Sequence, residues 1–155
     1  MPDLIDSFRG AFRFLSNPFE CPVRGPDLHL YPSVEYGFQA LKTIDEDQRI
    51  WVASAPTWQE AKSRGQLVTL RPGWNEHVRY TVMEQLIAAK FDPVDQPEMA
   101  TRLVATGDAT LIEGNNWHDN VWGVCSCSRT TCQRWGINLL GWMLMRQRTR
   151  VKAYQ

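Results

Sequence analysis

The spacing of apolar residues predicts a chain built mostly from helices, and the clearest pattern is YPSVEYGFQALK, residues 31–42. Ser33 follows a proline and is a favoured N-cap residue, so we expect a helix from Val34 to about Thr43. An apolar stripe repeats within it at i, i+4 and i+7, formed by Val34, Phe38 and Leu41. We expect this stripe to face the core.

Polar residues follow the same spacing one position further along, at Glu35, Gln39 and Lys42. An acid, an amide and an amine should therefore lie along one edge of the helix, at the margin of the core. Burial raises the pKa of a carboxyl group and a nearby ammonium lowers it, which is the arrangement that an acid–base site needs. An ordinary amphipathic helix with a charged flank shows the same pattern, so the spacing leaves both interpretations open.

Caps, breakers and periodicity predict further helices. Acidic residues open the first of them, a Thr-x-x-Glu capping box starts the second, and a long apolar face marks the third. The expected helices span residues 45–53, 57–65, 74–91, 97–105 and 135–146.

The β-structure should be sparse. Two short extended segments, 19–23 and 28–31, flank a Gly-Pro-Asp turn and predict a small hairpin. A short strand is expected at 110–113 and a polar turn at 114–118. We therefore expect a mainly α fold, a compact single helical domain over residues 1–150 with a frayed tail at 151–155.

The composition is typical of a globular protein and argues against extensive binding along long nucleic acids. The 155 residues are 43% hydrophobic and 22% charged, with a net charge of zero. Neutrality argues against tight, sequence-independent binding through phosphate neutralisation, although a nucleotide substrate stays possible. Seven tryptophans modestly favour a pocket that handles a base. Without a membrane-spanning run or a secretory signal, we expect a cytoplasmic protein that makes no membrane contact.

The cysteines are Cys21, Cys125, Cys127 and Cys132, and in a reducing compartment we expect no disulfides. The last three, with His118 or His29, offer ligands for zinc. Zinc sites usually pair their ligands as Cys-x2-Cys or as two histidines, and that spacing is missing. We therefore expect no cofactor and no metal.

Asp119 lies between amides and aromatics in NNWHDNVWG. It is a candidate catalytic acid or ribose ligand, but loop aspartates more often form an Asx-turn, which the local sequence favours. His118 alone carries little weight. Gly123 is a turn glycine that also allows a ligand to approach the backbone, but no Walker or dinucleotide fingerprint is present.

Several segments, in order, resemble the NADAR (YbiA-like) superfamily and cover nearly the whole chain. They are FRGAFRFLSNPF, YPSVEYGFQALK, ASAPTWQEAKSRG, RPGWNEHVRYTVMEQLIAAKF, LVATGDATLIEG, HDNVWG and GINLLGWMLMRQR. The resemblance implies a compact helical hydrolase that cleaves an N-glycosidic bond at a ribose. One branch resembles hydrolases of phosphoribosyl-amine intermediates of riboflavin synthesis. Another resembles enzymes that remove ADP-ribose from guanine in nucleic acid and so reverse DNA ADP-ribosyltransferase toxins.

The resemblance carries catalytic roles to Glu35, Lys42 and Asp119. A desolvated Lys42 would attack C1′ of the opened sugar and form a Schiff base that water releases. Glu35 would move protons at the ribose, and Asp119 would hold or activate it. We expect the ligand to contact a further set of residues: Arg9, Phe14, Asn17, Gln39, Trp74, Trp122, Gly123 and Asn138.

The cysteine segment and GNNWHDNVWG resemble stand-alone bacterial and phage members of the family more than the riboflavin branch. This resemblance implies ADP-ribosyl-guanine in DNA as the substrate, with riboflavin intermediates as the alternative. A non-catalytic sensor of ADP-ribose or NAD is a third possibility, which two acids beside a lysine disfavour. The expected binding partner is ADP-ribosylated nucleic acid or a ribose nucleotide. A DNA ADP-ribosyltransferase toxin is expected as a genetic partner, and the enzyme is expected to be a monomer. Basic residues near the end of the chain are expected in a solvated tail, with at most weak attraction for phosphate: Arg146, Arg148, Arg150 and Lys152.

Overall fold

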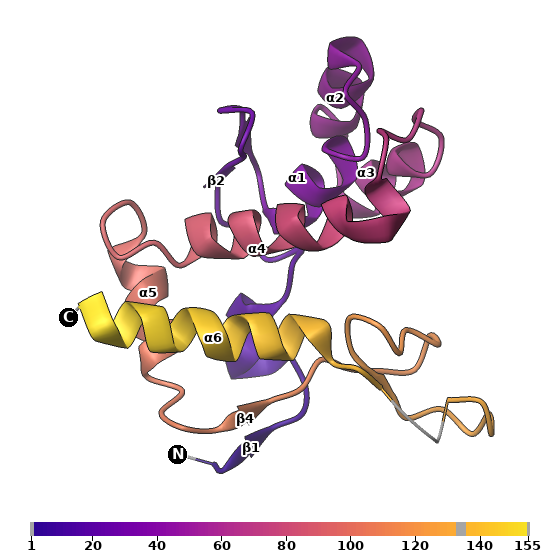
Figure 1. Cartoon of the computed structure of the whole chain (residues 1–155). Coiled ribbons are helices and arrows are strands. Elements are labelled where there is room, and N and C mark those ends of the chain that lie inside the picture. The colour runs from indigo at the N-terminus through magenta and orange to yellow at the C-terminus, as the bar shows by residue number, and fades with distance from the viewer. Residues whose placement is uncertain (1, 133–135, 155) are drawn as a thin grey trace. The chain divides into compact units, whose positions relative to one another are not determined.

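The computed structural model describes residues 2–132 and 136–154, which form two compact units (Figure 1). We call Asn17–Lys90 the central unit, and Met1–Ser16 together with Phe91–Gln155 the terminal unit. The sequence predicted one domain, and the structure divides that domain into these two parts. Among the described helices, none is both long and apolar enough to cross a membrane.

Four α-helices and a hairpin build the central unit. Helix α1 packs against each of the other three, so it forms the middle of this unit (Figure 1). The elements are β2 (Val23–Arg24), β3 (Leu30–Tyr31), α1 (Val34–Ala40), α2 (Glu46–Ala53), α3 (Trp58–Gly65), the π-helical turn η2 (Trp74–Val78) and α4 (Arg79–Lys90). The predicted hairpin is confirmed but shorter, with Val23 opposite Tyr31 in an antiparallel pair.

Helix α1 begins at Val34 after Ser33, as predicted, and its apolar stripe is buried. Its cap differs from the expectation, because the Ser33 hydroxyl makes no capping bond. The amide of Glu35 instead donates to the carbonyl oxygen of Asn17 at 3.0 Å, so the backbone of a distant residue satisfies a free helix donor. The helix ends at Ala40, earlier than the predicted Thr43.

Side-chain caps start α2 and α3 where the sequence placed them. Asp45 Oδ1 accepts from the amide of Gln48 at 2.9 Å, and Thr57 Oγ1 accepts from the amide of Glu60 at 3.2 Å. The Glu60 carboxylate accepts from Arg64 Nε at 3.0 Å, so it serves a pair within the helix.

The helix predicted over 74–91 has an irregular first turn. Gly73 adopts a φ of +73°, and its carbonyl oxygen accepts from the amides of both His77 and Val78. The second of these bonds widens the turn into η2, and regular α4 begins only at Arg79. The prediction of one long α-helix is therefore wrong in its first turn.

Both ends of the chain supply the terminal unit. Its elements are β1 (Leu4–Ile5), the 3-10 helix η1 (Gly10–Leu15), α5 (Pro97–Val104), β4 (Thr110–Leu111), β5 (Gly114–Asn115), β6 (Val124–Cys125) and α6 (Leu139–Tyr154). Strands β1 and β4 pair in parallel, as do β5 and β6. The polar turn expected at 114–118 is therefore wrong at its start, where Gly114 and Asn115 pair with β6.

Helix α6 corrects the prediction for the end of the chain. The expected helix over 135–146 begins later, at Leu139, and continues to Tyr154, while Trp135 lies outside the described residues. Arg148 is buried and donates to Thr106 Oγ1 at 2.8 Å and to the Ala109 carbonyl oxygen at 2.9 Å. These bonds join Arg148 to the turn after α5, so Arg148 does not belong to the solvated tail in which it was expected.

Candidate functional site

Helix α1 brings the predicted acid and amide into contact. Gln39 Nε2 donates a hydrogen bond of 2.9 Å to Glu35 Oε1, with Gln39 buried and Glu35 half-buried. Lys42 follows the end of the helix and is also half-buried. Its carbonyl oxygen accepts from the amide of Arg71 at 2.7 Å, which fixes the backbone at this lysine. The edge predicted from the spacing therefore carries a positioned carboxylate and a partly desolvated amine.

The surroundings of Lys42 favour its neutral form. Burial lowers the pKa of the Lys42 ammonium, the Glu35 carboxylate opposes that shift, and the like charge of Lys62 adds to it. Burial has the largest effect, so the net pKa lies below that of a solvated lysine. A larger fraction of Lys42 is consequently available as a nucleophile near neutral pH.

The amide oxygen of Gln39 is a buried acceptor. Gln39 Nε2 faces the carboxylate, which assigns the other atom as the oxygen, and Oε1 has no hydrogen-bond partner among the described residues. A Cβ at Gly65 of α3 would overlap with this oxygen, so the glycine preserves the space that the amide occupies. A buried amide oxygen without a donor costs about 1–3 kcal/mol, so the Glu35–Gln39 hydrogen bond is held in place at a cost in stability.

Trp74, predicted to contact the ligand, lies in the core of the central unit. Only 4% of its surface is exposed, and its ring centroid is 5.1 Å from that of Phe38 on α1. Asn17, another predicted contact, supplies the carbonyl oxygen that caps α1. Both residues thus have structural roles, and their contact with a ligand stays a prediction.

In the terminal unit, Asp119 forms the Asx-turn that the local sequence favoured. Its Oδ1 accepts from the amides of Val121 at 3.0 Å and Trp122 at 2.9 Å. The side chain of Asn115 fixes the same loop, because it donates to the carbonyl oxygen of Asp119 and accepts from its amide. Asp119 is half-buried, and its Oδ2 accepts no hydrogen bond from the residues that the structure describes. One carboxylate oxygen therefore holds the turn and the other is available.

Asn138 and Gly123 have structural roles nearby. Asn138 Oδ1 accepts from the amide of Glu113 at 3.1 Å, and its Nδ2 donates to the Leu111 carbonyl oxygen at 2.8 Å. A Cβ at Gly123 would overlap with the Glu113 carbonyl oxygen, so only glycine fits there. Trp122 contributes its amide to the Asx-turn. Ligand contacts by these three residues stay predictions.

The two remaining predicted contacts also lie in the terminal unit. Phe14 is buried, meets Phe91 edge to face with centroids 6.5 Å apart, and has the guanidinium of Arg102 4.3 Å from its ring centroid. Arg9 is exposed at the start of η1. The central unit therefore contains Asn17, Glu35, Gln39, Lys42 and Trp74, and the terminal unit contains Arg9, Phe14, Asp119, Trp122, Gly123 and Asn138.

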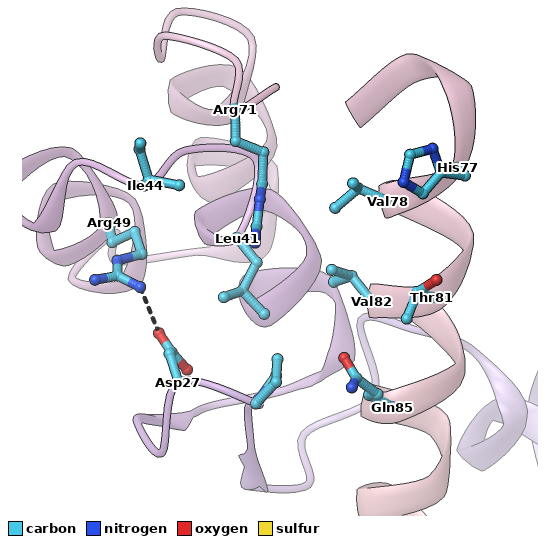
Figure 2. A pocket seen from close by; sticks show the side chains of 11 residues that line it. Asp27, Leu41, Ile44, Arg49, Arg71, His77, Val78, Thr81, Val82 and Gln85 are labelled. Carbon is cyan, nitrogen blue, oxygen red and sulfur yellow. Dashed lines mark hydrogen bonds and ion pairs between the residues drawn. The ribbon is translucent and has the colours of Figure 1, made fainter. Parts of the chain in front are cut away.

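A cavity of about 490 Å³ opens elsewhere in the central unit (Figure 2). Asp27 lies on its wall, where Oδ2 accepts from Tyr31 Oη at 2.6 Å and from Arg49 Nη1 at 3.2 Å. Burial and the Asp27 carboxylate raise the pKa of the Tyr31 hydroxyl. The residues that line the cavity are Pro26, Asp27, Leu41, Ile44, Arg49, Arg71, His77, Val78, Thr81, Val82 and Gln85. None of these residues is among the site residues predicted from the sequence.

A cluster of thiols and one imidazole lies in the terminal unit. His118 Nδ1 is 3.3 Å from Cys127 Sγ, 3.4 Å from Cys132 Sγ and 4.0 Å from Cys125 Sγ. All four potential ligand atoms lie within 4.8 Å of one another. His29, the other histidine considered, belongs to the central unit, where it lies 3.5 Å from Asp27. These four residues are irregularly spaced along the chain, so only the folded loop shows that they converge.

Comparisons with known proteins agree with the fold. A model of the NADAR domain matches residues 8–152. N-glycosidase YbiA of Shigella flexneri is 33% identical over 124 residues, which cover 79% of this chain and 71% of that protein. The chloroplastic riboflavin biosynthesis protein PYRR of Zea mays is 28% identical over 92% of this chain but only 23% of its own length. The NMR structure of E. coli YbiA superposes with a TM-score of 0.79 at 28% identity, covering 99% of this chain and 88% of that one. The predicted mainly helical, YbiA-like fold is confirmed.

Proposed function

Because the chain belongs to the NADAR domain family, we propose that it is an N-glycosidase that hydrolyses a bond between ribose C1′ and a nitrogen atom. Similarity to N-glycosidase YbiA supports this reaction class. The observation that carries the proposal is the partly buried amine of Lys42 just beyond the helix that holds the Glu35–Gln39 hydrogen bond, where burial lowers the pKa of Lys42. A binding protein has no need of a desolvated amine, so this feature disfavours the sensor.

Lys42 is the nucleophile in the proposed reaction. The Glu35 carboxyl group protonates the ring oxygen as the bond from C1′ to that oxygen breaks, which leaves an iminium between C1′ and the base nitrogen. The neutral amine of Lys42 adds to C1′, and the base leaves with a proton from that amine. Water then hydrolyses the protonated Schiff base on Lys42, which returns the free amine, gives a proton back to Glu35 and releases the sugar. Gln39 orients the Glu35 carboxyl group through its 2.9 Å hydrogen bond.

Asp119 holds the ribose in this proposal. Because Oδ1 is occupied by two backbone amides, Oδ2 is the atom that would accept from a ribose hydroxyl. The rigid loop around Asp119 limits the reorganisation that binding requires.

The substrate that we propose is ADP-ribosyl-guanine in DNA. The cysteine segment and the GNNWHDNVWG loop support it, since they differ from the simplest pattern that we associate with riboflavin-type members. Hydrolysis of phosphoribosyl-amine intermediates of riboflavin synthesis is the second candidate. The similarity to the maize riboflavin biosynthesis protein favours that candidate, although it covers a small part of the maize protein.

The proposal is tested with single-stranded DNA that carries ADP-ribosylated guanine, followed by mass spectrometry. Wild-type protein should release free ADP-ribose and restore guanine. Lys42→Ala should lose nearly all turnover, and Glu35→Gln should lose about 100-fold or more, the usual contribution of a general acid. Arg150→Ala, an exposed cation in the terminal unit, is the control and should keep wild-type turnover.

Borohydride distinguishes the covalent scheme from direct hydrolysis. Reduction during turnover should attach the sugar to wild-type protein at Lys42 and leave Lys42→Ala unlabelled. Full turnover by Lys42→Ala would refute the covalent scheme. If the protein cleaves phosphoribosyl-amines and leaves ADP-ribosylated DNA uncleaved, the second substrate is favoured. If it binds ADP-ribose and cleaves neither substrate, a sensor is favoured.

A further inference from the structure

The spacing of the four atoms in the thiol–imidazole cluster matches a tetrahedral zinc site. Zinc bonds of about 2.3 Å to sulfur and 2.0–2.1 Å to nitrogen place sulfur and nitrogen ligands roughly 3.6 Å apart, and two sulfurs roughly 3.8 Å apart. The distances from His118 Nδ1 to the three sulfurs are 3.3, 3.4 and 4.0 Å, two shorter and one longer than the sulfur–nitrogen spacing expected around zinc. All four atoms fall within 4.8 Å, so a modest contraction places them around one ion.

Hydrogen bonding alone does not explain the convergence. A neutral imidazole nitrogen offers either one proton or one lone pair, so His118 Nδ1 satisfies one thiol at a time. Three sulfurs nevertheless surround it, and all four cysteines of the chain are free of disulfides. A cation that binds three thiolates and the nitrogen lone pair satisfies all four groups together.

Hydrogen bonds hold the backbone around the cluster. The amide of Cys125, on β6, donates to Asn120 Oδ1 at 2.9 Å, and the amide of Cys132 donates to the Arg129 carbonyl oxygen at 2.9 Å. His118 has a φ of +72°, a left-handed conformation that residues other than glycine seldom adopt. The neighbouring Asn115–Asp119 bonds hold this turn, so they also hold the imidazole toward the sulfurs.

We propose that His118, Cys125, Cys127 and Cys132 bind one zinc ion and thereby cross-link residues 118–132 of the terminal unit. Three sulfurs and one imidazole nitrogen are a ligand set typical of structural zinc, and a fourth protein ligand leaves no open position for substrate. Cys125 and Cys132 are buried, Cys127 is half-buried and His118 is exposed, so the ion would lie beneath the imidazole. The mixed sulfur and nitrogen donors favour zinc over hard cations such as Mg²⁺.

The metal content of the full chain tests this inference directly. Protein expressed with zinc and purified without chelators should contain about one zinc ion per chain by mass spectrometry. Cys127→Ser and His118→Ala should each lose most of that zinc. Cys21→Ala removes a buried thiol outside the cluster, so it is the matched control and should keep the full zinc content.

Two further measurements do not depend on whether the variants fold. Mercurial titration of folded wild-type protein should release zinc in step with modification of the thiols. Cobalt added to the reduced, zinc-free protein should give the visible bands of tetrahedral cobalt with thiolate ligands. The proposal would be overturned if wild-type protein contained no more zinc than the background level and the zinc-free protein gave no cobalt–thiolate bands. It would also be overturned if the purified protein contained one iron atom per chain in place of zinc. None of these readouts depends on glycosidase activity.

Discussion

Lys42 shows how the position of a single side chain sets its chemistry. The residue lies just beyond a helix end, where half of its side chain is removed from water while a backbone bond to Arg71 holds it in place. Removing a charge from water is costly, so folding favours the neutral amine. Desolvation makes the Lys42 ammonium less favourable and thereby increases the fraction of neutral amine, which is the nucleophile.

The pH dependence of catalysis follows from the lowered pKa of Lys42. The reaction needs Lys42 neutral and Glu35 protonated, a pair that holds one proton in total, so kcat/KM should fall as the pH rises through the lowered pKa of Lys42, below the pH at which a solvated lysine titrates. Lys62 lowers the pKa of Lys42, so Lys62→Gln should move this fall to higher pH. Lys152→Gln is the control, since Lys152 pairs with Asp108 in the terminal unit and should leave the profile unchanged. A profile for Lys62→Gln that stays in place or moves to lower pH contradicts this account.

The contacts of single residues could be predicted from the sequence only where the two partners lie close together along the chain. Glu35 and Gln39 are separated by one helical turn, so their spacing predicted an edge whose hydrogen bond the structure contains. Ser33 was a sound N-cap by type, yet the donor that it would satisfy is bound by Asn17, which no local pattern reveals. The thiol–imidazole cluster could not be predicted, because His118 approaches the cysteines only in the folded loop.

At the scale of elements, the end of α6 shows what holds a basic helical segment in place. Arg148 reaches the turn after α5 with two hydrogen bonds, and Lys152 Nζ lies 2.8 Å from Asp108 Oδ1. The buried guanidinium has most of the effect, because the exposed ion pair contributes little.

Arg148→Ala should lower the free energy of unfolding by about 2 kcal/mol or more, because it leaves the Thr106 hydroxyl and the Ala109 carbonyl without their charged donor. Arg150→Ala removes an exposed arginine on the same helix and should change stability by less than about 0.5 kcal/mol. Urea unfolding, followed by far-UV circular dichroism, measures both. Equal stabilities for the two variants would mean that the α6 end contributes little.

Helices with local caps were predictable, and those fixed by distant contacts were not. Asp45 and Thr57 provide their own start signals within three residues. The π-helical turn after Gly73 and the long end of α6 depend on geometry that apolar spacing does not encode. Arg148 looked solvated in the sequence because its partners lie about forty residues earlier.

For the whole molecule, the net charge of zero limits how a DNA substrate is recognised. Binding through many phosphates would release many counterions and weaken steeply with salt. We therefore expect KM for the ADP-ribosylated oligonucleotide to rise no more than about tenfold between roughly 50 and 200 mM salt, the loss for one or two phosphate contacts. ADP-ribosylated guanosine without a DNA backbone is the control and should show a smaller change. A loss of about a thousandfold would instead indicate an extensive phosphate-binding surface.

The parallel pair of β1 and β4 has a consequence for synthesis of the chain on the ribosome. Leu4 pairs with Thr110, so this small sheet cannot form until most of the chain has been made. The central unit is continuous in sequence, from Asn17 to Lys90, and all its internal partners are available earlier. Leu4 and Ile5 are therefore synthesised long before the residues with which they pair, whereas the central unit can form its contacts while the chain is still being made.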